Sequence, residues 1–372
     1  MKSNKNVFYY LIHLTSCAVN GNQPNEKPED ISFQQIFEAA QFHKIANTVF
    51  YSIEKLNSKP EALLYNKWKY IRDESIAKDI IQHNEYNIII KTFTEEKIKI
   101  LPLKGVLLKA LYPKSDMRYM SDLDFLILEK DSRKVKLLME SLGYNCENLL
   151  KDNHDVYFKK PFMNVEIHRE LIGNTYPQFY DHFKDSWKNT IETSPYLYSY
   201  KTNDTFIFIM AHIAKHLLNA GTGIRSVLDF YLFYSTYKND LNMDYLNSEF
   251  VKLNITDIFQ NFIDISEKWF NNKYNTTTNQ EFENRIIYSG IYGTFENKVN
   301  SHIKNLGKNN YLISRIFPSH IFMSNQFPIL KKLPLLLPLF WTIRLIKSVI
   351  FKKNKIKNEL NIYNNYHERN KN

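Results

Sequence analysis

Three segments decide the fold: Leu-Pro-Leu-Lys-Gly at residues 101–105, Arg-Tyr-Met-Ser-Asp-Leu-Asp-Phe-Leu-Ile-Leu at 118–128, and Asn-Val-Glu-Ile-His-Arg-Glu at 164–170. The first predicts a strand that turns into a helix, and the other two predict strands. Side chains two residues apart on a strand point to the same side of the sheet. Asp122 and Asp124 therefore share one face, and the apolar residues beside them share the other.

This pair of acids predicts a metal site. Two adjacent carboxylates repel each other unless a cation lies between them. Mg²⁺ suits oxygen ligands of this kind and needs few protein carboxylates when substrate phosphates supply the rest. A third carboxylate, Glu166, would complete a site for two ions that supports in-line displacement at phosphorus. An isolated glutamate on a strand would face solvent, but the aspartate pair favours a shared role. We therefore expect Asp122, Asp124 and Glu166 to be catalytic residues and metal ligands.

The arrangement resembles the nucleotidyltransferase superfamily of DNA polymerase β. The order Leu-Lys-Gly, Tyr-Pro, Arg-x-Met-x-Asp-Leu-Asp and Glu-Ile-His is similar to one largely uncharacterised bacterial branch of it. The resemblance covers about residues 80–235. The superfamily has Gly followed by Gly or Ser shortly before the aspartate pair. Lys104-Gly105-Val106 stands here instead, with a longer gap, so the contacts to the triphosphate are expected to differ.

The resemblance implies an α+β fold: a polymerase β-like core with a small mixed sheet, flanked by helical N- and C-terminal regions. It also implies transfer of a nucleoside monophosphate from a nucleoside triphosphate, with ATP as the expected nucleotide. The acceptor would be a hydroxyl or phosphate of a small molecule, a glycan precursor or a peptide, and pyrophosphate would be released. Glu166 would help to deprotonate that acceptor.

Four residues near the aspartates are expected to hold the triphosphate: Lys104, Gly105, Arg118 and Ser121. Glycine lets the backbone approach a phosphate, and a helix N-terminus offers free N–H groups. A guanidinium such as that of Arg118 stays charged and can bind phosphate in a bidentate way. The alternative for Lys104-Gly105 is a plain turn between a strand and a helix.

Two later cations are candidates for the same substrate. In related enzymes a helical domain helps to close the nucleotide cleft, and by that resemblance Lys215 and Arg225 would face the phosphates. Alternatively, Arg225 and Asp229 form an i, i+4 ion pair on a helix surface, which would contribute little stability.

The length of 372 residues allows two or three domains. Hydrophobic spacing predicts a helix over 62–96, a helix near 131–142, a hairpin over 154–169, helices from Tyr176 onward and disorder over 361–372. The expected regions are an N-terminal helical region (1–75), the nucleotidyltransferase core (76–175), a helical domain (176–330) and a basic amphipathic tail (331–372).

Charge is concentrated in that tail. The chain has 49 basic and 39 acidic residues, a net charge of +10. Residues 331–358 contain eight basic residues and no acidic one, so the remainder carries only +2. We therefore expect no tight binding of nucleic acid by the core. Two cysteines make no disulfide framework, which favours the cytoplasm.

The tail has two interpretations. The apolar run Leu333–Ile343 is too short to span a bilayer and contains two prolines. Residues 339–353 carry an apolar stripe with Trp341, opposite basic side chains, which is typical of a peripheral contact with the inner membrane surface. The alternative is a C-terminal helix packed on protein. A further alternative for the whole chain is a non-catalytic nucleotide-binding or membrane-surface scaffold of a cell-envelope system, although a scaffold has no need of three repelling acids.

Overall fold

A computed structural model describes residues 5–366 except for residues 148, 151–152, 174–175, 272, 274 and 292. The chain divides into two compact units, one of residues 1–215 and 223–291 and the other of residues 216–222 and 292–372. The expected α+β class with helical flanks is confirmed. The finer division into four regions stays a prediction.

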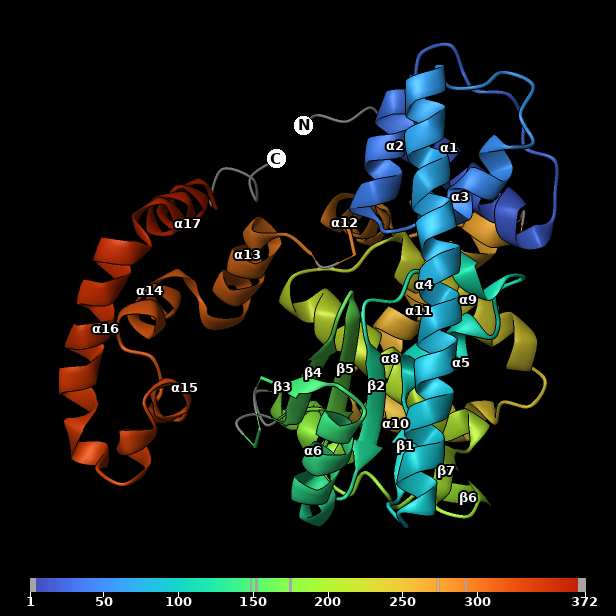
Figure 1. Cartoon of the computed structure of the whole chain (residues 1–372). Coiled ribbons are helices and arrows are strands. Elements are labelled where there is room, and N and C mark those ends of the chain that lie inside the picture. Colours follow the sequence, from blue (N-terminus) through green and yellow to red (C-terminus); the bar gives the residue numbers. More distant parts are fainter. Residues whose placement is uncertain are drawn as a thin grey trace. The chain divides into compact units, whose positions relative to one another are not determined.

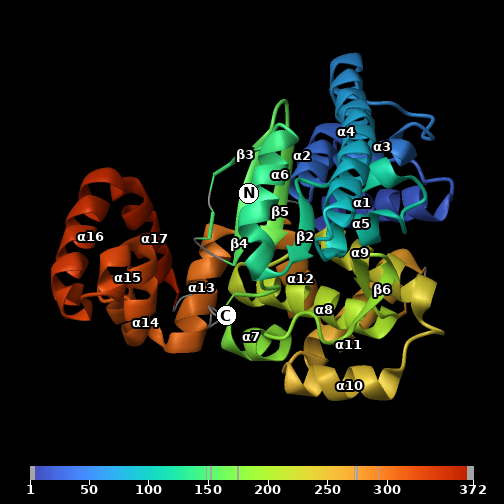
Figure 2. The ribbon, with the colours of Figure 1, turned by 60° about the horizontal axis from the view of Figure 1, so that its bottom comes forward.

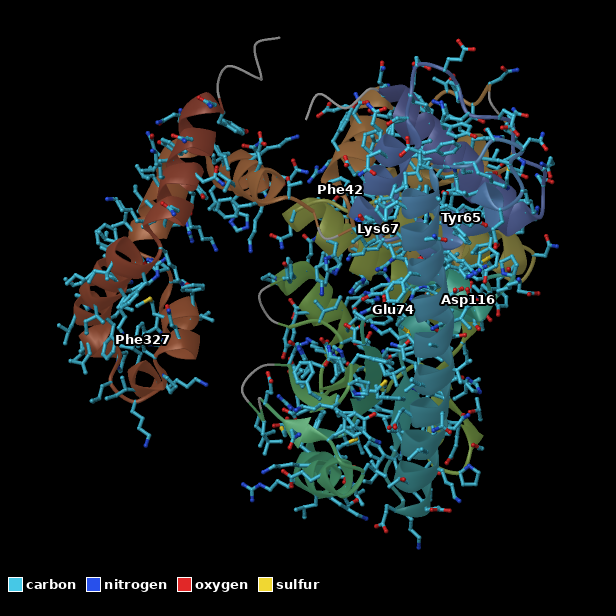
Figure 3. All side chains as sticks on the ribbon, turned by 45° about the horizontal axis from the view of Figure 1, so that its top comes forward. Phe42, Tyr65, Lys67, Glu74, Asp116 and Phe327 are labelled. Atoms are coloured by element: carbon cyan, nitrogen blue, oxygen red, sulfur yellow. The ribbon has the colours of Figure 1, made fainter. Side chains whose placement is uncertain are left out.

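Four helices open the first unit: α1 (Lys5–Asn20), α2 (Phe33–Phe42), α3 (Ala46–Ile53) and α4 (Ala62–Glu95). The predicted long helix is α4, and it runs beside the other three and then along the sheet (Figure 1). Its buried residues include Trp68, Ser75, Gln82 and Ile89, which recur every seventh position and so lie on one side of the helix. Ser75 Oγ donates to Asp116 O at 2.8 Å, and Figure 3 shows Asp116 beside this helix.

Within the described residues, seven strands form one mixed sheet in the order β3-β4-β5-β2-β1-β7-β6. The strands are β1 (Ile100–Pro102), β2 (Leu123–Ile127), β3 (Asn145–Cys146), β4 (His154–Lys159), β5 (Met163–His168), β6 (Thr190–Ser194) and β7 (Leu197–Tyr200). The predicted hairpin is confirmed, because β4 and β5 pair antiparallel. In the centre of the sheet, β2 pairs antiparallel with β1 and parallel with β5.

One face of this sheet is apolar. Its buried side chains include Leu123, Phe125 and Ile127 of β2, and Val165 and Ile167 of β5. They pack against α4 and against α6 (Ser132–Ser141), which begins one residue after the predicted start. Helices α8 (Thr202–Asn219) and α11 (Thr256–Phe270) lie on the other side of the sheet (Figures 1 and 2). The polar side chains of β2 and β5 therefore point toward this second helical layer.

Two local expectations were wrong. The chain after Tyr176 is not only helical, because β6 and β7 extend the sheet beside β1. Lys104-Gly105 was predicted to be a turn before a helix over 106–111, but helix α5 (Lys104–Lys109) already begins at Lys104, so both residues lie in its first turn.

The rest of the first unit is helical: α7 (Pro177–Phe183), α9 (Ile224–Tyr237), α10 (Met243–Lys252) and α12 (Gln280–Ser289), besides α8 and α11. Phe206 of α8 holds this layer together, with its ring 5.7 Å from that of Phe230 and 5.9 Å from that of Phe259. Such aromatic contacts add to the apolar area that the helices bury.

The second unit is built from α13 (Phe295–Leu306), α14 (Lys308–Ile316), α15 (His320–Gln326), α16 (Leu337–Phe351) and α17 (Lys353–Asn365), which Figure 2 shows together. Its small core contains Val299, Ile303 and Tyr311. The predicted disorder over 361–372 was wrong up to Asn365, where α17 ends, and residues 367–372 lie outside the described residues.

The predicted apolar stripe of residues 339–353 is partly packed on protein and partly exposed in this unit. Trp341 is half-buried, its ring lies 5.2 Å from that of Phe317, and its Nε1 donates to Pro318 O at 3.0 Å. Val349 and Ile350 on α16 are exposed. Among the described residues, one stretch, Pro334–Phe351, is long and apolar enough to cross a membrane by length and composition, and none of it is buried. The prediction that the apolar segment is too short to span a bilayer was therefore wrong on length, because it considered only Leu333–Ile343.

Candidate active site

Adjacent strands bring two of the predicted acids together. In the parallel pairing of β2 with β5, Asp124 lies opposite Glu166 and Leu126 lies opposite His168. Because side chains alternate along each strand, Asp124, Glu166 and His168 all project from the face opposite the apolar core. The backbone hydrogen bonds of the sheet thus determine where these three side chains meet.

Asp124 is buried between two cationic groups. Its Oδ2 lies 3.6 Å from Lys104 Nζ, and its Oδ1 lies 3.0 Å from His168 Nε2. Burial alone would raise the pKa of Asp124, but Lys104 and His168 outweigh burial and bring that pKa well below the usual range for aspartate. Asp124 is therefore ionised at neutral pH, as a metal ligand must be.

Glu166 lies beside two histidines. Its Oε2 is 3.6 Å from His168 Nε2 and 3.6 Å from His154 Nε2. The hydrogen bond with His168 lowers the pKa of Glu166, against burial and the charge of Asp124, which raise it. Burial would lower the pKa of His168, but its hydrogen bonds with Asp124 and Glu166 raise that pKa more strongly. The acids and His168 thus stabilise each other's charged forms.

Asp122 interacts electrostatically with Asp124 and Glu166. It is half-buried, and its Oδ1 accepts a hydrogen bond from Ser121 Oγ at 3.0 Å. Burial raises the pKa of Asp122, and the negative charges of Asp124 and Glu166 raise it further. A divalent cation near these oxygens would relieve that repulsion.

The donor set fits a divalent metal ion. One ligand atom each from Asp124, Glu166 and His168 lies within 4.8 Å of the others. Asp122 is not part of this tightest group, whereas His168, which the sequence did not single out as a ligand, belongs to it. The alternation of β5 already placed His168 on the face of Glu166 and was the signal that could have identified it. The metal-binding roles of Asp122, Asp124 and Glu166 stay predictions.

Lys104 and Gly105 begin helix α5 next to this cluster. Lys104 Nζ is the cation nearest Asp124 Oδ2. A Cβ on Gly105 would lie 2.9 Å from Met120 Sδ, which is closer than real Cβ contacts. A larger residue there would require the flexible Met120 side chain to shift, and the predicted contact of Gly105 with phosphate stays a prediction.

Arg118 is buried in an ion pair with Asp229. Its Nε lies 2.8 Å from Asp229 Oδ1, its Nη2 lies 2.9 Å from Asp229 Oδ2, and its Nη1 donates to Gly105 O at 3.3 Å. Tyr112 Oη also donates to Asp229 Oδ1, at 2.7 Å. These contacts join α5, the segment before β2 and α9. Three of the five N–H groups of Arg118 are thus engaged with protein, and its role in holding the triphosphate stays a prediction.

The two later cations differ in position. Burial, followed by repulsion from Lys104, lowers the pKa of Lys215 to about 8, although Asp124 and Glu166 act in the opposite direction. Lys215 therefore lies within the electrostatic field of the acidic cluster. Arg225 Nη1 donates to Tyr119 O at 3.0 Å, and Asp229 is occupied by Arg118. Among the described residues, the carboxylate of Asp229 thus binds Tyr112 and Arg118, and it does not form the alternative i, i+4 ion pair with Arg225.

Comparison with known proteins bears on this geometry. A family model described as "uncharacterised nucleotidyltransferase" matches residues 29–271, which contain every residue discussed for the site. Comparisons with curated proteins and with solved structures gave no match. Because the family match covers well over half of the chain, this protein belongs to the family of uncharacterised nucleotidyltransferases and is a transferase of nucleotidyl groups.

Proposed function

We propose that this enzyme transfers a nucleoside monophosphate from a nucleoside triphosphate, with ATP as the expected nucleotide, to a hydroxyl or phosphate group, and releases pyrophosphate. The observation that carries the proposal is the register of β2 and β5, which sets Asp124 opposite Glu166 beside Asp122. These acids lie close together in a member of a nucleotidyltransferase family, and such a group of carboxylates supports the binding of two Mg²⁺ ions.

The ions would polarise the phosphoryl group and stabilise the attacking and leaving oxygens. Asp122, Asp124 and Glu166 would hold them, and Glu166 would help to accept the proton of the acceptor. Lys104, which lies 3.6 Å from Asp124, and Lys215, which lies within the field of the acids, would bind the negatively charged triphosphate. Ser121, through its contact with Asp122, would orient that carboxylate. For Arg118 the structure supports a positioning role through Asp229, and Arg225 remains a proposed contact of the nucleotide.

The acceptor we propose is a small molecule, a glycan precursor or a peptide. A nucleic-acid acceptor would favour a basic groove, but outside residues 331–358 the chain carries a net charge of only +2.

We further propose a cytoplasmic enzyme whose residues 339–353 contact the inner membrane surface. Val349, Ile350 and the nearby Phe351 are exposed on α16, and the segment 331–358 has eight basic residues and no acidic one, which suits an anionic lipid surface. Arg344 and Lys347 lie near the middle of the apolar stretch Pro334–Phe351. A charged side chain at the centre of a bilayer costs about 2.5–3.5 kcal/mol on insertion scales, so a position on the surface is favoured over spanning.

The decisive experiment incubates the full-length enzyme with each α-labelled nucleoside triphosphate, Mg²⁺ and cell extract, and identifies the labelled product by mass spectrometry. Metal-dependent labelling of a small molecule, glycan precursor or peptide, lost in Asp124→Asn, is the expected result. Labelling of nucleic acid would contradict the proposed acceptor class. Nucleotide binding without any transfer, equal in wild type and Asp124→Asn, would instead favour the scaffold.

A further inference from the structure

His168 has the geometry of a metal ligand in its own right. It is 7 % exposed, and its Nε2 points between the two carboxylates, 3.0 Å from Asp124 Oδ1 and 3.6 Å from Glu166 Oε2. Neighbouring ligands of an octahedral ion with bonds of about 2.1 Å lie about 3.0 Å apart. The separation of Nε2 from Asp124 Oδ1 already equals that spacing. One ion that displaces the Nε2 proton could therefore contact both atoms.

The other nitrogen of the ring does not compete for this role. His168 Nδ1 is buried and has no hydrogen-bond partner among the described residues. Metal-ligating histidines usually donate their second ring N–H to a partner, and this ring lacks that contact among the described residues. The ring instead packs against the ring of His154, whose centroid lies 5.0 Å away and whose plane is tilted by 32°.

We propose, on the basis of the function proposed above, that His168 Nε2 directly ligates one of the divalent ions together with Asp124 and Glu166. The donor set of that ion is then two carboxylates and one imidazole. Imidazole nitrogen suits first-row transition ions, whereas Mg²⁺ prefers oxygen ligands throughout. At the site bearing His168, Mn²⁺ should therefore bind more tightly than the Mg²⁺ of the proposed reaction, while the ion nearer Asp122 keeps an all-oxygen set.

His154 provides an internal comparison. It lies opposite His168 in the pairing of β4 with β5, and its Nε2 lies 3.6 Å from Glu166 Oε2. It is thus a histidine of the same face that is placed beside Glu166. We assign it the positioning of Glu166, and it should contribute no nitrogen to the ion.

Mn²⁺ is the probe that tests this assignment without reference to turnover. Mn²⁺ is added to the full-length wild type, His168→Gln and His154→Gln, and pulsed electron paramagnetic resonance detects coupling between the bound ion and a ¹⁴N nucleus. We expect nitrogen coupling in the wild type and in His154→Gln, and none in His168→Gln. Calorimetric titration should show that His168→Gln lowers the affinity for Mn²⁺ by about tenfold or more, and lowers the affinity for Mg²⁺ by clearly less.

Two results would overturn the assignment: Mn²⁺ bound at Asp124 without nitrogen coupling in the wild type, or coupling that persists in His168→Gln. Either would make His168 a positioning residue. The proposed function has a separate criterion, because it fails if Asp124→Asn leaves Mn²⁺ binding unchanged or if no nucleotidyl transfer is found. Circular dichroism of each variant establishes that it is folded, and His168→Asn provides a second substitution if His168→Gln is not.

Discussion

Arg118 and Asp229 form a buried, bidentate ion pair, in which Nε lies 2.8 Å from Oδ1 and Nη2 lies 2.9 Å from Oδ2. The two residues are 111 positions apart, so the pair joins the segment before β2 to helix α9. Through Arg118 Nη1 it also reaches Gly105 O in α5. The helix that carries Lys104 is thereby held against the strand that carries Asp124.

Breaking this pair should destabilise the fold. Arg118→Met leaves Asp229 buried without its cation, and such a loss costs about 3–5 kcal/mol. Urea denaturation followed by circular dichroism should show that decrease in the free energy of unfolding. The double variant Arg118→Met/Asp229→Leu should lose less than the sum of the single variants, because no uncompensated charge remains.

A surface pair serves as the control for this effect. Lys136 and Glu140 lie 3.5 Å apart and are both substantially exposed. Lys136→Met should change the free energy of unfolding by less than about 1 kcal/mol. A loss in Arg118→Met as small as that of this control would refute the structural role of the buried pair.

Asp124→Asn should abolish nucleotidyl transfer while leaving the fold intact. Loss of a metal ligand removes several kcal/mol of transition-state stabilisation, which corresponds to a decrease in kcat of roughly a hundredfold or more. Release of pyrophosphate measures the effect. Asp181→Asn, which changes an exposed aspartate on α7, is the matched control and should retain full activity. Comparable rates in wild type and Asp124→Asn would remove Asp124 from the catalytic centre.

The charge of Lys215 should appear in the pH profile. With its pKa lowered to about 8, Lys215 is protonated below that pH and neutral above it. If the ammonium group binds the triphosphate, kcat/KM for the nucleotide should fall as pH rises through about 8, because that ratio reports the free enzyme. Lys215→Arg, which stays charged, should shift this decrease to much higher pH. A profile identical in the two proteins would assign the decrease to another group.

The exposed part of α16 should bind anionic membrane. Co-sedimentation with vesicles of increasing anionic content should rise with that content and fall with salt, since each basic residue contributes about 1 kcal/mol near such a surface. Val349→Glu should abolish the binding. Leu63→Glu, at an exposed position of α4 with 86 % accessibility, should have no effect. Equal sedimentation of wild type and Val349→Glu would contradict the proposed membrane contact through α16.

Much of the core could be predicted because its pattern is local. The alternation around Asp122 and Asp124 identified β2, and Pro161-Phe162 between two alternating runs identified the hairpin. By contrast, β6 has the sequence Thr-Ile-Glu-Thr-Ser and is mostly exposed, so it carries no alternation of apolar and polar residues. Its position is fixed by pairing with β7 and not by its own composition.

The partners of the charged residues could not be predicted in the same way. Nothing near Arg118 in the sequence indicates Asp229, because the pair depends on how α9 packs against the loop before β2. Likewise, the spacing gave no sign that Gly105 packs closely against the side chain of Met120, fifteen residues away in the sequence. Such contacts follow from tertiary packing, which residue spacing does not encode.

The placement of Asp124 and Glu166 on interior strands has a thermodynamic consequence. Both β2 and β5 are hydrogen-bonded along their two edges, so the carboxylates can separate only if the central ladder breaks. Amide hydrogens of these strands should accordingly exchange only through global unfolding. Ions and nucleotide held there would stabilise the whole sheet, by about 2.7 kcal/mol at a ligand concentration one hundred times Kd. The melting temperature of the core is thus a direct gauge of occupancy, and candidate nucleotides can be ranked by it before any acceptor is known.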